Sequence, residues 1–250
     1  MSAITEAANT ITNWPALLGT KPLRKCGDLL QAIEVYNESE FIQPPPPPVI
    51  PATITRETLT AVTATLAVNL VSVAEFDTAA KQIRDHCAQR VINLAVNSVE
   101  DLVGAIEFKA AADSFVAAVC ELPESLSLSS GSVAVANYEQ AKDAHKQLEK
   151  YDSFLSSLTV IYGGRPEPAL RCLKPVTRED FQHITDRQGS RKAYEGLRDH
   201  WVWAARNSVV FEPHTPQQCA ELRATLEALP LERKRPKTAQ LGAFAPVNRI

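Results

Sequence analysis

Five consecutive prolines at positions 44–48 separate two segments whose patterns favour helices. A proline run fixes φ and lacks backbone donors, so it favours a polyproline II rod that rises about 3.1 Å per residue. It is excluded from helix interiors and central strands. We therefore expect residues 44–52 to be a stiff spacer, which can hold an N-terminal arm with short helices, residues 1–43, away from the body of the protein.

The clearest periodic pattern follows this spacer. Eleven apolar residues recur every three or four positions, with an average step of 3.5: Leu59, Val62, Leu66, Leu70, Val73, Phe76, Ala80, Ile83, Cys87, Val91 and Leu94. They predict one stripe on a helix of about 40 residues that begins near Thr55. Because 3.5 is also the coiled-coil period, the natural partner of this stripe is a bundle or a coiled-coil seam.

The first part of this segment carries no charge. Residues 58–74 contain eight threonines and valines among 17 residues, and both types are β-branched. A strand is therefore an alternative to a helix here. If the segment is a helix, its uncharged back face predicts a cover, supplied by the rest of the chain or by a neighbouring subunit.

Two further long helices are expected in the next stretch. Ser98 is a plausible N-cap for a helix that Pro123 ends, and another helix is expected at 134–162, ended by Gly163 and Gly164. The fold class is therefore mainly α, with a bundle of three long helices at 53–162.

A smaller helical region is expected at 163–230. Thr177 and Thr215 have N-cap patterns, and residues 208–211 favour a short strand. Residues 231–250 have little periodicity and are expected to be an extended basic tail. The chain thus has an extended arm at each end of a helical body.

Charge is distributed unevenly. Residues 1–162 carry 11 basic and 19 acidic side chains, whereas residues 163–250 carry 15 basic and 10 acidic ones. The basic part either folds against the acidic body of its own chain or reaches an acidic surface of another chain. The sequence leaves both alternatives open.

Nothing in the composition predicts a membrane protein or a secreted one. We find no signal-peptide pattern and no window with the roughly 18 apolar residues that a membrane span needs. The five cysteines form no Cys-x-x-Cys pair, so we expect reduced thiols and neither a metal site nor a cofactor. The expected location is the cytoplasm or an assembled particle.

The sequence also predicts no catalytic residues. His86 is adjacent to Cys87, and Asp199 to His200, but adjacent side chains on a helix point about 100° apart and pair badly. His183 and His214 have no neighbours at metal-ligand spacing. We therefore expect a protein without enzymatic activity.

The candidate partner-binding residues are two tryptophans and a basic cluster. Trp201 and Trp203 are either core residues or interface anchors, because tryptophan is favoured at binding hot spots. The cluster comprises Arg233, Lys234, Arg235 and Lys237. We expect a structural subunit of a multi-chain assembly, such as a virus or phage particle component, that self-associates or contacts sister subunits. The alternative is a helical protein that binds nucleic acid through its basic C-terminal part.

Overall fold

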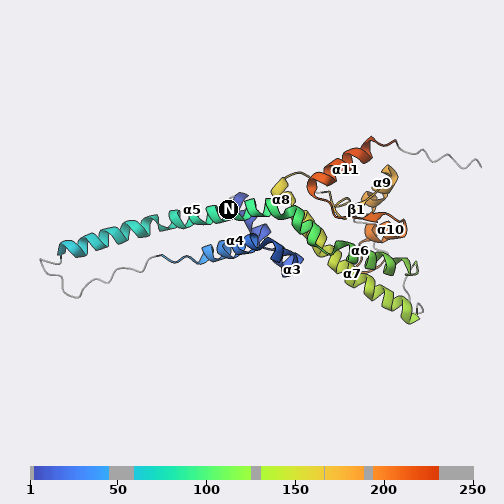
Figure 1. The fold of residues 1–250 in the computed structure, drawn as a ribbon, viewed down its shortest axis with the longest axis horizontal. Coiled ribbons are helices and arrows are strands. Elements are labelled where there is room, and N and C mark those ends of the chain that lie inside the picture. Colours follow the sequence, from blue (N-terminus) through green and yellow to red (C-terminus); the bar gives the residue numbers. More distant parts are fainter. Residues whose placement is uncertain (1–2, 45–58, 125–130, 166, 189–193, 231–250) are drawn as a thin grey trace, which may run out of the picture.

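Helices make up most of the protein, which confirms the mainly α fold class (Figure 1). The computed structural model describes residues 3–44, 59–124, 131–165, 167–188 and 194–230. The expected polyproline spacer at 44–52 lies outside the described residues except for Pro44, and the expected basic tail at 231–250 lies entirely outside them.

The chain begins with short helices and continues with longer ones. In order, the helical elements are α1 (Ala3–Ile11), α2 (Trp14–Leu18), α3 (Thr20–Leu23), η1 (Arg24–Cys26), α4 (Gly27–Glu38), η2 (Ser39–Phe41), α5 (Leu59–Ala105), α6 (Phe108–Cys120), α7 (Gly131–Ser157), α8 (Thr159–Tyr162), α9 (Arg178–Arg187), α10 (Asp199–Arg206) and α11 (Pro216–Ala228). Strands β1 (Leu173–Lys174) and β2 (Val210–Phe211) pair antiparallel, with Leu173 opposite Phe211.

Residues 59–74 form a helix and not a strand, because α5 begins at Leu59. The prediction that Ser98 starts a new helix is wrong, since α5 continues through it to Ala105. The physical reason is that the apolar stripe keeps its phase across Ser98: Val91, Ala95, Val99 and Leu102 are all fully buried. Packing of a continuous stripe outweighs the local capping preference of one serine.

The N-terminal residues differ from the expected arm. Helices α1 and α4 pack along α5, so the N-terminal part of the chain belongs to the body (Figure 1). Its apolar side chains are buried in the same core as those of α5 to α7: Ala8, Ile11, Trp14, Leu18, Leu23, Leu29, Ile33 and Tyr36. Burial of each large side chain contributes about 1.5–3 kcal/mol, which outweighs the tendency of a stiff spacer to separate the two parts.

The bundle of three long helices is not confirmed in the expected form. Helix α5 packs against α1 and α4, whereas α6 packs against α7. The C-terminal region, with α9, α10, α11 and the two strands, lies on the α6 and α7 side (Figure 1).

The predicted ends of several helices are confirmed. The Thr177 hydroxyl accepts a hydrogen bond from the Asp180 amide, and Thr215 and Gln218 form a complete capping box. Gly163, with φ of 68°, follows the last turn of α8 and donates its amide to Thr159. These local patterns place the C-terminal helices where the sequence predicts them.

Trp14 tests whether the N-terminal segment is part of the core. Its ring is fully buried, contacts Phe154 edge-on at 5.1 Å, and donates a hydrogen bond from Nε1 to Ser157 Oγ at 2.8 Å. Trp14→Ala is expected to lower the free energy of unfolding by about 3–5 kcal/mol, measured by urea denaturation. The matched control is Ile4→Ala in α1, a side chain that is 40% exposed and should cost much less. Equal effects of the two changes would contradict the docking of this segment.

Candidate interaction surface

The first half of α5 has no buried side chain among those that the structure describes. We call residues 59–83 the projecting segment and residues 84–105 the basal segment; Figure 1 shows the projecting segment extending beyond the described helices. Side chains are described at 60–68 and 75–83, and none of these is buried. Val68 is 68% exposed and Ile83 is 48% exposed. The uncharged face predicted to be covered is therefore not covered by any described part of the chain.

The base of the projecting segment is fixed by α4 and η2. Arg84 forms an ion pair with Glu40, and its guanidinium lies 5.6 Å from the centre of the Tyr36 ring. Helix α4 therefore lies beside α5 from Arg84 onward. The cover that α4 gives to α5 begins where the projecting segment ends.

Exposed apolar side chains gather around this base. Val35 is 48% exposed, Phe41 73% and Ile42 38%, and Ile83 lies one residue before Arg84 on α5. We call these four residues the base cluster. Exposed apolar residues that occur singly are ordinary, but a group beside an uncovered helix is a typical feature of an interaction surface.

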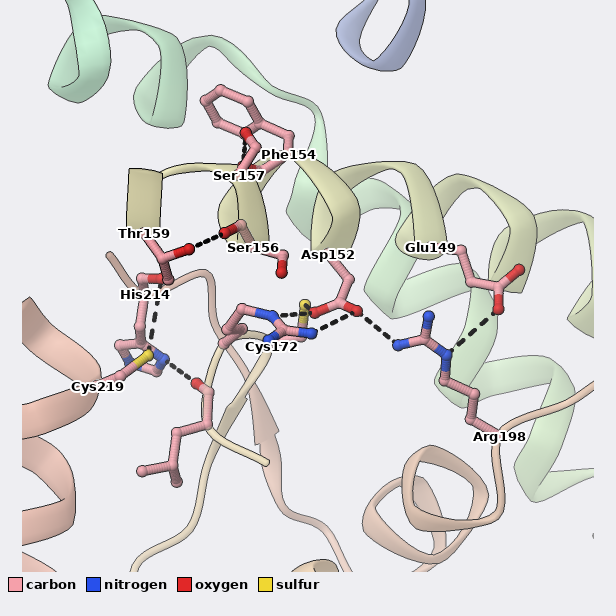
Figure 2. A network of polar contacts seen from close by, with 12 residues as sticks. Glu149, Asp152, Phe154, Ser156, Ser157, Thr159, Cys172, Arg198, His214 and Cys219 are labelled. Atoms are coloured by element: carbon pink, nitrogen blue, oxygen red, sulfur yellow. Dashed lines mark hydrogen bonds and ion pairs between the residues drawn. The ribbon is translucent and has the colours of Figure 1, made fainter. Parts of the chain in front are cut away.

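A different kind of site lies between α7 and the C-terminal region, where Asp152 is almost completely buried. Arg171 binds both of its carboxylate oxygens, with Nε at 2.7 Å and an Nη at 3.1 Å. Arg198 donates to the same carboxylate at 2.6 Å, as Figure 2 shows. Burial raises the pKa of Asp152, but the two arginines outweigh it, so this pKa lies below its ordinary value.

Arg198 extends the network to three other side chains. Its Nε donates to Glu149 at 3.2 Å, as Figure 2 shows, and its guanidinium lies 4.5 Å from the centre of the Trp201 ring. Its backbone amide donates to Nε2 of buried His145 at 3.0 Å. The network thus joins α7 to the start of α10, and it is a structural connection whose charges are mutually satisfied.

Most described basic residues of the C-terminal part form ion pairs with acidic residues of their own chain. Two of them, Arg171 and Arg198, bind acidic residues of α7. Others bind acidic partners within the C-terminal region: Lys174 with Glu212, Arg187 with Asp199, and Arg223 with Glu167 and Glu227. The described basic residues thus largely fold against their own chain. The nucleic-acid alternative depends on residues 231–250, outside the described residues.

The predicted partner-binding residues lie in three different environments. Trp201 is 1% exposed and packs against Phe115 and His145, so it is a core residue and is inaccessible to a partner. Trp203 is half-buried, with His183 at a ring distance of 5.3 Å, and its partner role stays a prediction. Arg233, Lys234, Arg235 and Lys237 lie outside the described residues.

The histidines and cysteines show structural contacts. Burial raises the pKa of Cys172 well above its ordinary value and that of Cys219 to about 12, which disfavours the nucleophilic thiolate. Nδ1 of His214 lies 2.8 Å from the Leu170 carbonyl. Within the described ranges, no group of three His, Cys, Asp or Glu side chains is arranged to hold a metal ion.

A groove of about 800 Å³ lies between the end of α5, α6 and β2. Val103, Phe108, Val116 and Phe211 contribute apolar walls, and Lys109 also lines it. Its lining residues come from α5, α6, α10, β2 and the segments beside them, which the sequence pattern does not relate. Among the described helices, none is long and apolar enough to cross a membrane.

Comparisons with protein-family models, with curated proteins and with solved structures give no match to this chain. The functional assignment therefore depends on the geometry of its own residues.

Asp152 tests the buried network. Asp152→Ala leaves two partly buried guanidinium groups without their anion and is expected to lower the free energy of unfolding by about 3–5 kcal/mol. Asp143→Ala is the matched control on the same helix, because its ion pair with Lys146 is solvent-exposed and contributes at most about 1 kcal/mol. Denaturant titration at neutral pH measures both. A small effect of Asp152→Ala would show that the network does not hold the C-terminal region.

His200 predicts a pH dependence of stability. Burial, and then the nearby Arg198 cation, lower its pKa to about 4, and its Nε2 has no hydrogen-bond partner in the described structure. The unfolded chain binds a proton below the ordinary pKa of 6.5, whereas the native imidazole resists it until about pH 4. The free energy of unfolding should thus fall by up to about 3 kcal/mol as the pH drops from 6.5 to 4.

Denaturant titrations across this window measure the effect. His200→Gln should flatten the profile, and exposed His86→Gln is the control that should leave it unchanged. His214, whose pKa burial also lowers, contributes a residual slope of the same sign in both variants. A profile that His200→Gln leaves unaltered would contradict the assignment.

Proposed function

We propose that this protein is a non-enzymatic structural subunit of a multi-chain assembly, such as a virus or phage particle component, and acts through subunit–subunit contacts. The observation that carries the proposal is the projecting segment, which no described part of the chain covers. The proposal concerns this surface and does not depend on the basic tail.

The composition of the projecting segment supports a role in contact with another molecule. A helix surface that faces water usually carries charged residues, yet residues 58–74 carry none. Threonine and valine each cost a helix several tenths of a kcal/mol relative to alanine, and this stretch contains eight of them. Most helical stability in proteins comes from packing of an apolar face, so this segment gains most from a partner that packs on it.

The rest of the described chain supports a structural role. The C-terminal basic residues and the α7 acidic residues neutralise one another in ion pairs, as Arg171, Arg198 and Asp152 show. The buried thiols of Cys172 and Cys219 are held protonated by burial. The body is therefore suited to hold the projecting segment rigidly at its base.

The proposal predicts that the full chain associates in solution. Native mass spectrometry and sedimentation should give a mass that is a multiple of 27.4 kDa. Leu66→Lys places a charge on the half-buried stripe of the projecting segment and should weaken association at least tenfold, because a lysine in an apolar interface must be desolvated.

Val133→Lys is the matched control, since Val133 is a 72% exposed apolar residue on α7, away from the projecting segment. It should leave the mass distribution unchanged. A chain that stays strictly monomeric at high concentration would overturn the proposed function.

A further inference from the structure

We propose that the partner of the projecting segment is a second copy of this chain, bound antiparallel, so that the tip of each projecting segment reaches the base cluster of the other copy. This inference rests on the proposed function and adds the identity and orientation of the partner. It follows from which part of α5 is already covered by its own chain.

The stripe of α5 is covered in its basal half, whereas no described part of the chain buries the described side chains of its projecting half. Along the basal segment, α4 lies against α5 near Cys87 and Arg90, where Ala32 and Val35 of α4 face them across a small notch. The same stripe continues backward to Ala80 and is only half-buried there. A partner helix that follows this stripe from Leu59 toward the basal segment therefore ends near Arg84, where the cover by α4 starts.

This arrangement excludes a close parallel pair. In a parallel pair the two bases lie side by side, and each base carries its own α4 on the seam. Packed helices lie only 8–10 Å apart, so two α4 helices between the two α5 helices would force the seam open. In an antiparallel pair, each tip instead lies along the projecting half of the partner's stripe and continues the line of the partner's α4.

The stripe is self-complementary when it is reversed. In an antiparallel pair centred on residue 71, Leu59 lies level with Ile83, and Val62 lies level with Ala80. Leu66 lies level with Phe76. Six apolar positions of one copy therefore meet apolar positions of the other, as a coiled-coil seam requires. Near the centre, Leu70 and Val73 lie level with Ser72 and Asn69, each one residue away from a direct match with the other.

Charge favours the same orientation. A parallel pair places Glu75 and Asp77 level with the same residues of the second copy, which brings like charges together. In the antiparallel pair these two residues lie level with Ala67 and Thr65, which are uncharged. The uncharged first part of one projecting segment can thus lie against the charged second part of the other without bringing like charges together.

The available area requires the contact between tip and base. The projecting segment is about 37 Å long, and covering about a third of a helix that is roughly 11 Å wide buries about 430 Å² per copy. The two copies together bury about 850 Å², below the roughly 1,000 Å² of a specific interface. The exposed apolar side chains of the base cluster, with Phe41 the most exposed, supply the remaining area.

Cysteine cross-linking of the full chain tests the orientation. In a background where Cys26, Cys87 and Cys120 are replaced by serine and the buried Cys172 and Cys219 are kept, one preparation carries Val62→Cys and another carries Ala80→Cys. These positions lie level in the antiparallel pair, whereas two copies of position 62 are about 27 Å apart. Mild oxidation of the equimolar mixture should give a disulfide-linked dimer, and oxidation of either preparation alone should give monomers on a non-reducing gel.

The other outcomes overturn the inference in distinguishable ways. Cross-linking within each preparation alone would show a parallel pair, and no cross-linking in a chain that still has a dimeric or larger native mass would show that another surface associates. Both results overturn the antiparallel pair. The first leaves the proposed function standing, whereas the second keeps a multi-chain assembly but removes the projecting segment as its contact surface. A monomeric native mass, as expected if another part of the same chain covers the stripe, overturns both.

Discussion

The packing of α4 against the basal half of α5 determines most of the architecture. It brings residues of the N-terminal segment, such as Tyr36, into the core, and the ion pair of Glu40 with Arg84 marks where the cover of α5 ends. It also sets the length of α5 that extends past α4, because Leu59 lies 25 residues before Arg84 on one helix, about 37 Å away.

Periodicity predicted α5 well because its stripe is long and keeps its phase, and caps predicted the C-terminal helices because capping is local. The same local logic failed at Ser98, where the buried stripe continues through a serine that is a good N-cap. It also failed for the N-terminal segment, where the proline run suggested separation. The helical spacing of Leu29, Ile33 and Tyr36 indicates an apolar face, and this face is buried in the body. A spacer limits local conformation but does not decide where the preceding residues pack.

The candidate site could be predicted only in part. The absence of charge at 58–74 is visible in the sequence and identifies the surface. The network around Asp152 is not visible, because Arg171 and Arg198 lie 19 and 46 residues away and no spacing rule connects them. Residue type also misled for Trp201, since tryptophan is favoured both in interfaces and in cores, and only the three-dimensional packing on Phe115 distinguishes the two.

The body of the protein and the projecting segment differ in how they handle charge. In the body, Asp152 is buried with two arginines, so its charges are satisfied internally and leave the packing of the C-terminal region well specified. Residues 59–74 of the projecting segment carry no charge, and apart from Asn69 their side chains are apolar or carry a hydroxyl group. A surface of this kind gains free energy by removal from water and imposes no charge requirement on what covers it. Specificity must then come from shape and length, because α4 covers only the basal half of a single continuous stripe and no described element buries the described side chains of the other half.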